Sequence, residues 1–269
     1  MDVRGQRAVF GADLAAAARA VVSQPSVPLV SFLATVVPSL PTVLLTSGVH
    51  STVFTRAATV IGYACMSFLL GWYGSERVFF QRQFAGKPAP LYRLLGLPKA
   101  FIGRFVALGL PLAAILLAFT LFAFSVFPPQ GGQMPVVRFQ ATYGLLIVAM
   151  DFALTFVTPA LAYTTRSARR ALGIGFAMIR QTWPRCAFYV LCPPLALNIM
   201  HVVYPADTLG VQFALSAVLV LVGLLAKGAI AAFYLRERGS YSDDGAAYIP
   251  ARDEPPGSVT LATPTVRVR

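Results

Sequence analysis

Long apolar runs separated by basic connections form the dominant pattern of this sequence. Six runs are long enough to cross the hydrocarbon core of a bilayer, which takes about 20 predominantly apolar residues in a helix. Their approximate bounds are residues 27–46, 57–73, 105–127, 141–163, 186–204 and 213–234. The pattern therefore predicts an all-α, polytopic membrane protein whose membrane domain covers residues 25–235.

The two ends of the chain lie outside this pattern. Segment 1–24 carries apolar positions at spacings of three and four, which place them on one helical face and predict an amphipathic helix on the inner leaflet. Those positions are Phe10, Leu14, Ala17 and Val21. Segment 236–269 is polar and rich in Pro, Asp, Thr and Ser, so we expect a disordered cytoplasmic tail.

Basic residues concentrate on one side of the predicted membrane domain. Segment 1–24 and the loops that follow the second and fourth runs hold 14 Lys and Arg residues, whereas the outer connections hold 2. Because cytoplasmic loops carry the excess of Lys and Arg, both termini are predicted to be cytoplasmic, and the protein to be a multi-pass protein of the plasma (inner) membrane. The 57% hydrophobic and 12% charged composition agrees with a membrane protein.

The net charge of +12 raises the question of a nucleic-acid partner. A protein that binds a polyanion gathers its bases on one solvated face, whereas here they lie between apolar runs. We therefore expect no nucleic acid, and we expect the bases to contact anionic headgroups of the inner leaflet or an acidic surface of a membrane protein partner. A homo-oligomer is also compatible with the sequence.

The two long cytoplasmic connections have different patterns. Residues 74–103 are predicted to form a loop, with Glu76 as their single acid and with apolar side chains resting on the bilayer surface, namely Val78, Phe79, Phe80 and Phe84. In the second connection, an apolar arc of Leu172, Phe176, Ile179 and Trp183 adjoins a basic arc of Arg166, Arg169, Arg170 and Arg180. This second pattern predicts an interfacial amphipathic helix that contacts anionic lipid or a partner.

Asp151 is the most informative intramembrane residue, because an acid near the bilayer centre is costly. It is interpreted either as a proton or cation site, with Thr155 and Thr158 on the same helical face, or as a hydrogen-bonded residue that joins two helices. Lys227 is the one base within a predicted span, so it either pairs with Asp151 or extends toward the inner headgroups. Asn198 is a further polar candidate, which also suits capping of carbonyls freed by Pro194.

Prolines interrupt the first, fourth and fifth runs, at Pro38, Pro41, Pro159, Pro193 and Pro194. Breaks of this kind expose backbone groups to substrate in transporters, but prolines are also common in membrane helices generally. Both interpretations stay open from the sequence.

Motifs that specify a reaction or a metal are absent from the sequence, so we expect no enzyme, no catalytic residues and no cofactor. His50, His201 and Asp207 map to the outer side but lack the spacing of metal ligands, and we interpret them as solvated loop residues. The three cysteines, Cys65, Cys186 and Cys192, are interpreted as small buried hydrophobes.

Residues 150–162 read Met-Asp-Phe-Ala-Leu-Thr-Phe-Val-Thr-Pro-Ala-Leu-Ala, and Ala171-Leu172 and Trp183 follow before the next run. This arrangement resembles bacterial six-helix membrane proteins of unknown function, similar to the membrane domain fused to some glycerophosphodiester phosphodiesterases. The resemblance implies a span that ends near a proline, then a surface helix, then another span. The sequence holds no counterpart of the phosphodiesterase domain, so no catalytic residue is carried over.

Two functions follow from these observations. The leading hypothesis is a non-enzymatic accessory or scaffold component of the plasma membrane, because basic loops are abundant and reaction motifs are missing. The alternative is a small permease or ion-coupled transporter that uses Asp151. A lipid-modifying enzyme is disfavoured by the missing motifs.

Overall fold

Helices account for 89% of the described residues in the computed structural model, and those residues form no strand. The structure describes residues 3–39, 52–126, 136–203 and 209–237. The elements are α1 (Val3–Ser23), α2 (Ser26–Val36), the 3-10 turn η1 (Val37–Ser39), α4 (Thr52–Phe84), α5 (Leu91–Gly96), α6 (Pro98–Val126), α7 (Val136–Leu154), α8 (Val157–Tyr163), α9 (Ala168–Thr182), α10 (Ala187–Val203) and α11 (Leu209–Glu237). The prediction of an all-α chain is confirmed for this part.

Two helical stretches, Pro98–Phe122 and Phe213–Glu237, are long and apolar enough to cross a membrane. They correspond to the runs predicted at 105–127 and 213–234. A membrane protein is therefore indicated by the structure as well as by the sequence.

The run predicted at 141–163 is divided into α7 and α8, which together pass the same test but meet at an angle of 41°. Pro159 explains the break, because it has no N–H with which to bond the carbonyl four residues earlier, at Thr155. The helix ends before that residue and resumes at Val157. The fourth run is thus broken near its proline, whereas in the fifth run α10 continues through Pro193 and Pro194.

Among the described residues, none of the other three predicted runs forms a helix that passes this test. Those at 27–46 and 186–204 contain the shorter apolar helices Ser26–Val36 and Ala187–Ala196. The run at 57–73 lies within α4. A count of six spans stays a prediction.

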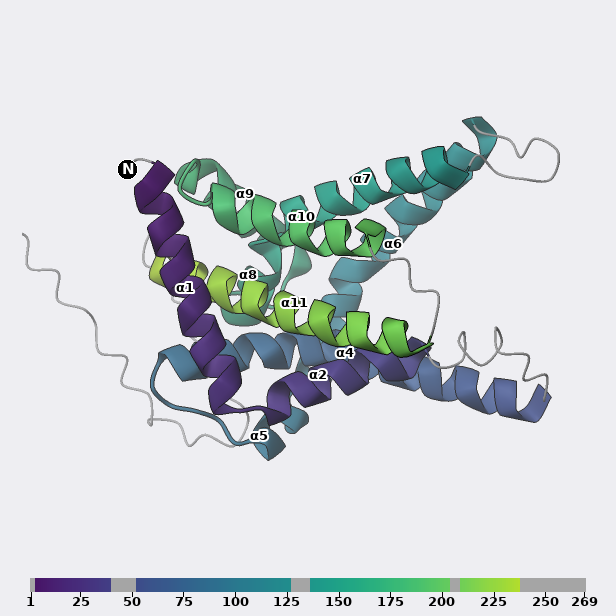
Figure 1. The fold of residues 1–269 in the computed structure, drawn as a ribbon, viewed down its shortest axis with the longest axis horizontal. Coiled ribbons are helices and arrows are strands. Elements are labelled where there is room, and N and C mark those ends of the chain that lie inside the picture. Colours follow the sequence, from purple (N-terminus) through teal and green to yellow (C-terminus); the bar gives the residue numbers. More distant parts are fainter. Residues whose placement is uncertain (1–2, 40–51, 127–135, 204–208, 238–269) are drawn as a thin grey trace, which may run out of the picture.

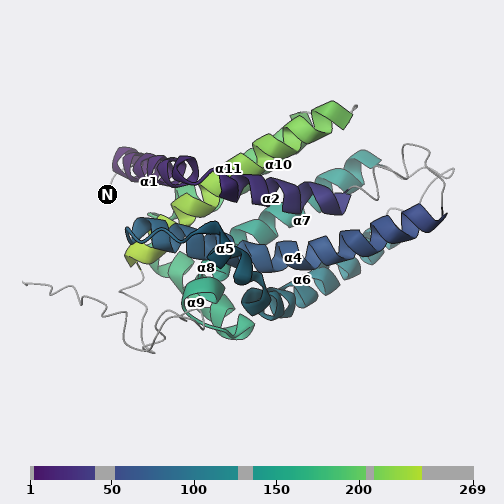
Figure 2. The ribbon, with the colours of Figure 1, turned by 90° about the horizontal axis from the view of Figure 1, so that it is seen from below.

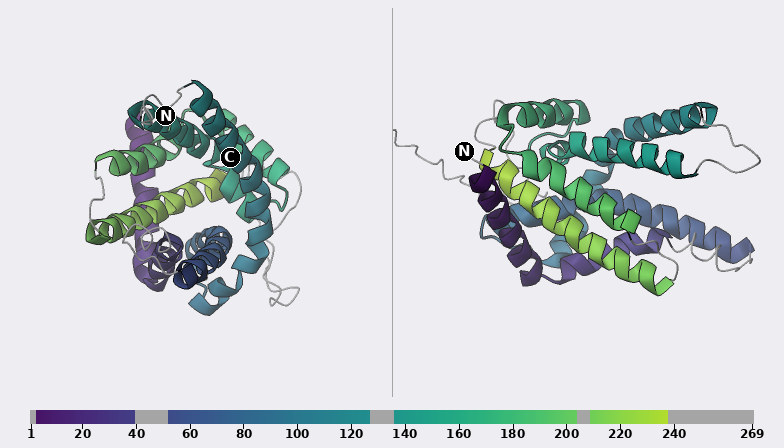
Figure 3. Two further views of the ribbon diagram at one scale, coloured as in Figure 1. Left: turned by 90° about the vertical axis from the view of Figure 1, so that its right-hand side faces the viewer. Right: turned by 45° about the horizontal axis from the view of Figure 1, so that its top comes forward.

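Helix α11 lies against α1, α2, α4 and α10, and α4 runs beside α6 (Figures 1 and 2). Helix α9 packs on α8. Helix α9 lies near the end of the molecule where α1 crosses α11, and α4, α6 and α7 extend toward the other end (Figures 1 and 3). The short helix α5 contacts α4 and α6.

Two glycines allow these helices to approach closely. A Cβ atom added at Gly71 of α4 would lie 2.5 Å from the carbonyl oxygen of Pro98 at the start of α6. One added at Gly228 of α11 would lie 2.5 Å from the Cβ of Ala17 in α1 and 2.6 Å from the ring of Phe80. Small residues at such contacts are typical of helix pairs in membranes.

The predicted loop at 74–103 is wrong over most of its length, because helices α4, α5 and α6 cover all of it except residues 85–90 and 97. Helix α4 continues to Phe84, and Phe79 and Phe80 are fully buried between helices instead of resting on a bilayer surface. Their rings contact each other at 4.9 Å between centroids. The segment that looked like a charged loop is therefore part of the packed core.

The N-terminal segment forms the predicted helix, but it packs on the protein. Ala17 of α1 is fully buried. Asp13 accepts two hydrogen bonds from the Arg236 guanidinium, at 3.0 and 2.9 Å, and a third from the Tyr189 hydroxyl at 2.5 Å. Contact of α1 with the inner leaflet stays a prediction, and residues 238–269 of the expected tail lie outside the described part.

Candidate functional site

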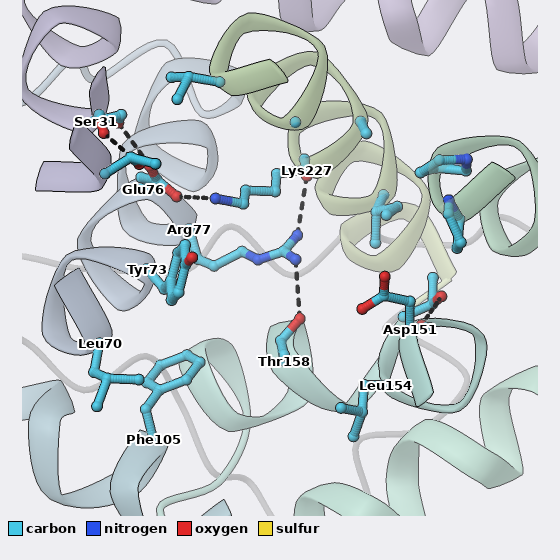
Figure 4. Close-up of a pocket in the computed structure, with 18 of the residues that line it drawn as sticks. Ser31, Leu70, Tyr73, Glu76, Arg77, Phe105, Asp151, Leu154, Thr158 and Lys227 are labelled. Carbon is cyan, nitrogen blue, oxygen red and sulfur yellow. Dashed lines mark hydrogen bonds and ion pairs between the residues drawn. The ribbon is translucent and has the colours of Figure 1, made fainter. Parts of the chain in front are cut away.

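A cavity of about 570 Å³ lies between the helices, within the size range of small-molecule sites. Its walls come from α2, α4, α6, α7, α8, α10 and α11 (Figure 4). Four of the five predicted intramembrane polar residues line this interhelical cavity: Asp151, Thr155, Thr158 and Lys227. The fifth, Asn198, belongs to α10, and its side chain lies outside the described part of the structure.

Lys227 forms an ion pair with Glu76, at 2.5 Å between Nζ and Oε2. The carboxylate side chain is only 2% exposed, and its other oxygen accepts a hydrogen bond from the Ser31 hydroxyl at 2.6 Å. Trp72 Nε1 donates to the same hydroxyl at 2.8 Å, and the Lys227 ammonium lies 4.2 Å from the centre of the Tyr73 ring. Both oxygens of a buried carboxylate are thus satisfied, as burial demands.

This pair corrects the sequence interpretation, in which Asp151 was the candidate partner of Lys227. Glu76 was placed in a cytoplasmic loop, whereas α4 carries it into the protein interior. Lys227 therefore bonds a neighbouring helix, and extension toward the headgroups is not needed to explain its position.

Arg77 follows Glu76 and is also buried, with 6% of its surface exposed. Its Nη1 donates to the carbonyl oxygen of Lys227 at 3.0 Å, and its Nη2 donates to the Thr158 hydroxyl at 2.9 Å. Within the described ranges, no carboxylate lies within ion-pair distance of the guanidinium. We call Ser31, Glu76, Arg77, Thr158 and Lys227 the polar cluster; it holds two cations and one anion.

Asp151 lies on α7 and is exposed to the cavity. Its carboxylate makes no hydrogen bond or ion pair with any residue that the structure describes, and it points into the cavity on the side toward Arg77 (Figure 4). Thr155 donates to the backbone carbonyl of Asp151 at 2.9 Å, and Thr158 is engaged by Arg77. Neither threonine assists the carboxylate in the way that the sequence suggested.

The rest of the cavity wall is mainly apolar. Helices α6 and α11 supply most of it, with Leu70 of α4 and Leu154 of α7. The apolar lining residues of these four helices are Leu70, Phe105, Leu108, Leu112, Leu154, Leu219, Val220, Ala226 and Ile230. The interhelical cavity thus combines a small charged region with a larger hydrocarbon surface.

Helix α9 carries three of the four basic residues predicted to contact lipid or a partner, and the fourth, Arg166, precedes it. Ser167 caps its N-terminus by accepting from the Arg170 amide at 3.5 Å. Its buried face consists of small or flexible residues packed toward α8, while the predicted apolar arc is partly outside, with Phe176 and Trp183 each 50% exposed. The basic side chains are exposed: Arg166, Arg169, Arg170 and Arg180.

The remaining candidates give no second site. His50, Asp207 and the side chain of His201 lie outside the described residues, among which no group of three His, Cys, Asp or Glu residues is placed to hold a metal ion. Cys186 is buried, whereas Cys65 and Cys192 are half-buried, and all three are free thiols.

The sequence analysis did not identify three residues of the polar cluster as site residues: Ser31, Glu76 and Arg77. The sequence contained one indication that Glu76 and Arg77 belong to a packed helix. Trp72, Glu76, Phe79 and Phe80 recur at helical spacing past Tyr73, and all four are buried in the structure. Ser31 gave no signal, since an isolated serine in an apolar helix is common.

No known protein family, no curated protein and no solved structure matches this chain. The resemblance of residues 150–162 to the fused membrane domain stays a prediction.

Proposed function

We propose that this protein is a small permease of the plasma membrane, with six spans and both termini cytoplasmic, and that it binds its solute in the interhelical cavity beside Asp151. The charge distribution of the loops supports this orientation. A permease was the alternative to the scaffold hypothesis in the sequence analysis. As there, we expect that the protein is not an enzyme.

One observation carries the proposal, namely the cavity-facing carboxylate of Asp151, which has no partner among the residues that the structure describes. A charged group inside a membrane protein that serves structure alone is paired or hydrogen-bonded, as Glu76 is. Asp151 faces the cavity and bonds no described residue, which is the arrangement of a group that meets a solute, an ion or a proton. The break between α7 and α8 lies directly next to it, as in carriers built from discontinuous helices.

The scaffold hypothesis retains support from α9. Exposed Phe176 lies on the same helix as the exposed Arg169, Arg170 and Arg180, and exposed Arg166 and Trp183 flank this helix, which suits a helix resting on anionic headgroups. This contact is compatible with a permease, so α9 alone does not separate the two functions. Neutralising Arg169, Arg170 and Arg180 is expected to weaken binding to vesicles that contain phosphatidylglycerol and to leave the cavity intact.

A thiol-accessibility experiment tests the permease without knowledge of the solute. The three cysteines are replaced by alanine, and Gly223 of α11 is changed to Cys, at a cavity position where an added Cβ has no heavy atom within 4 Å. A membrane-impermeant sulfonated maleimide is then added to right-side-out and to inside-out vesicles. We expect labelling from both faces, because a carrier opens its cavity to each side in turn.

The matched control is Leu221→Cys, two residues earlier on the same helix, where the side chain is 45% exposed and lies outside the cavity lining. We expect no labelling there, since a thiol facing lipid does not ionise. Labelling of the Gly223→Cys variant from one face or from neither would contradict a carrier.

A further inference from the structure

Not all charged groups around the interhelical cavity have an oppositely charged partner among the described residues. Glu76 is matched by Lys227 and Ser31. The Arg77 guanidinium has two neutral acceptors but no carboxylate partner among the described residues, and the Asp151 carboxylate has no partner there at all. One cation and one anion of the cavity therefore make no direct ion pair with any described residue.

Uncompensated charges in a largely apolar interior are costly, so a ligand that matches them gains more than it would in water. The guanidinium has five N–H donors in a planar fork, of which the structure uses two, and this fork suits a carboxylate or a phosphate. The Lys227 ammonium, 25% exposed, has donors to spare beside it. An ionised Asp151 accepts hydrogen bonds only, and so suits an ammonium group.

We propose that the interhelical cavity binds a zwitterion with an apolar body, whose anionic group is held by Arg77 and Lys227 and whose ammonium group is held by Asp151. The apolar body lies against Leu108 and Leu112 of α6 and Leu219 of α11, which line the same cavity. This inference rests on the proposed function, since it names the class of solute that the permease carries.

Two sources supply this chemistry: a free amino acid with an apolar side chain, and a lipid with an ethanolamine phosphate headgroup. Both combine a primary ammonium, an anionic oxygen group and a hydrocarbon portion. A ligand with only an anionic group would leave Asp151 without an ammonium partner, and a ligand with only an ammonium group would leave Arg77 without an anionic partner. We call these two kinds of ligand half-ligands and use them as comparisons.

The test is a binding titration of the full chain in dodecyl maltoside micelles. The sequence has two tryptophans, and Trp183→Phe leaves Trp72, which reports on the cavity because it donates to Ser31 next to Glu76. The first ligand series is leucine, leucine methyl ester and 4-methylpentanoate, which share a carbon skeleton and differ in charge. The second is lysophosphatidylethanolamine with lysophosphatidylglycerol of the same chain length, which lacks the ammonium.

We expect the zwitterion of one series to bind at least about tenfold more tightly than its half-ligands, because each lost charge-assisted hydrogen bond corresponds to a factor of that order. Asp151→Asn should reduce the zwitterion to the affinity of the ligand without an ammonium. Arg77→Gln should remove the advantage of the anionic group. Glu237→Gln and Arg93→Gln, which make the same chemical changes outside the cavity, should leave all affinities unchanged.

Arg77→Gln also removes the bonds to the Lys227 carbonyl and Thr158, so it is open to misfolding; Asp151→Asn, whose carboxylate bonds nothing described, carries the test. Preference in the leucine series identifies a free amino acid, and preference in the lysolipid pair identifies a lipid. Equal affinities within both series, or no binding in either, overturn the zwitterion assignment. If Gly223→Cys is still labelled from both faces, the permease stands and only the ligand class fails.

Discussion

Replacement of Lys227 by Met provides a direct energetic test of the polar cluster. Met keeps the unbranched apolar stem and removes the ammonium, so the main loss is the ion pair with Glu76, whose side chain is 2% exposed. Removing one partner of a buried pair leaves an uncompensated charge and costs about 3–5 kcal/mol. Loss of the contact with the Tyr73 ring adds about 0.5–1 kcal/mol.

The free energy of unfolding is measured by titrating the purified protein from a nonionic micelle into a denaturing detergent, with fluorescence as the signal. Arg185→Met is the matched control, because its pair with Glu237 is 3.4 Å long and the Arg185 side chain is 49% exposed. Such exposed pairs contribute about 0.2–1 kcal/mol. The double variant Lys227→Met with Glu76→Gln removes both charges and should recover at least half of the loss.

Two results would refute this reasoning. The first is a loss for Lys227→Met no larger than that for Arg185→Met, which would mean that the Glu76 carboxylate is not buried as the structure shows. The second is a double variant less stable than Lys227→Met alone, since neutralising a stranded carboxylate has to be favourable.

Further predictions concern helix packing and the N-terminal helix. Gly71→Ala should lower the free energy of unfolding by about 1–3 kcal/mol, because the added Cβ would lie 2.5 Å from the Pro98 carbonyl oxygen. Gly103→Ala, on α6 with open space around the added atom, should instead be neutral or stabilise by up to about 1 kcal/mol, and equal losses would contradict the close approach of α4 and α6. Asp13→Asn weakens the two bonds from Arg236, whose side chain is 43% exposed, and should cost about 1 kcal/mol. Amide exchange in α1 should then accelerate about fivefold, and unchanged exchange would show that α1 is held by its apolar contacts alone.

Hydrophobic run length predicted the helical class well for a physical reason. A chain surrounded by lipid has to satisfy its backbone groups internally, so long apolar stretches become helices with few exceptions. The runs at 105–127 and 213–234 match the two clearest candidates for membrane helices. Pro159 in the run at 141–163 coincides with a break, because its missing N–H frees a carbonyl. Helix α6 continues through Pro111, and α10 continues through Pro193 and Pro194, so a proline alone does not determine where a helix ends.

The end of the second run could not be predicted by the same rule. Charged residues after Tyr73 suggested a loop, yet α4 continues through them to Phe84. Charge marks the boundary of a lipid-facing segment, but it does not mark the end of a helix whose charges are paired inside the protein. Glu76 and Arg77 find partners on α11 and α8, and those helices follow about 80 to 150 residues later in the chain.

The pairing of Lys227 was missed because sequence position gives depth along a helix axis but not rotation about it or the identity of neighbouring helices. The sequence offered Asp151 as a partner because Asp151 and Lys227 both lie within predicted spans. The structure turns Lys227 toward α4, where Glu76 lies. Neighbouring helices are set by the packing of small residues such as Gly228 against α1 and α4, which no count of depth contains.

The ion pair between Glu76 and Lys227 changes the interpretation of Asp151. Apolar side chains give little drive for helices to associate in lipid, so polar contacts determine which helices stay together. The polar cluster performs that task by joining α2, α4, α8 and α11 through Ser31, Glu76, Arg77, Thr158 and Lys227. If Asp151 had paired with Lys227, both residues would be explained by helix association. Because Glu76 satisfies Lys227, the Asp151 carboxylate is left facing the cavity without a structural role among the described residues, and the case for a solute-binding role is correspondingly stronger.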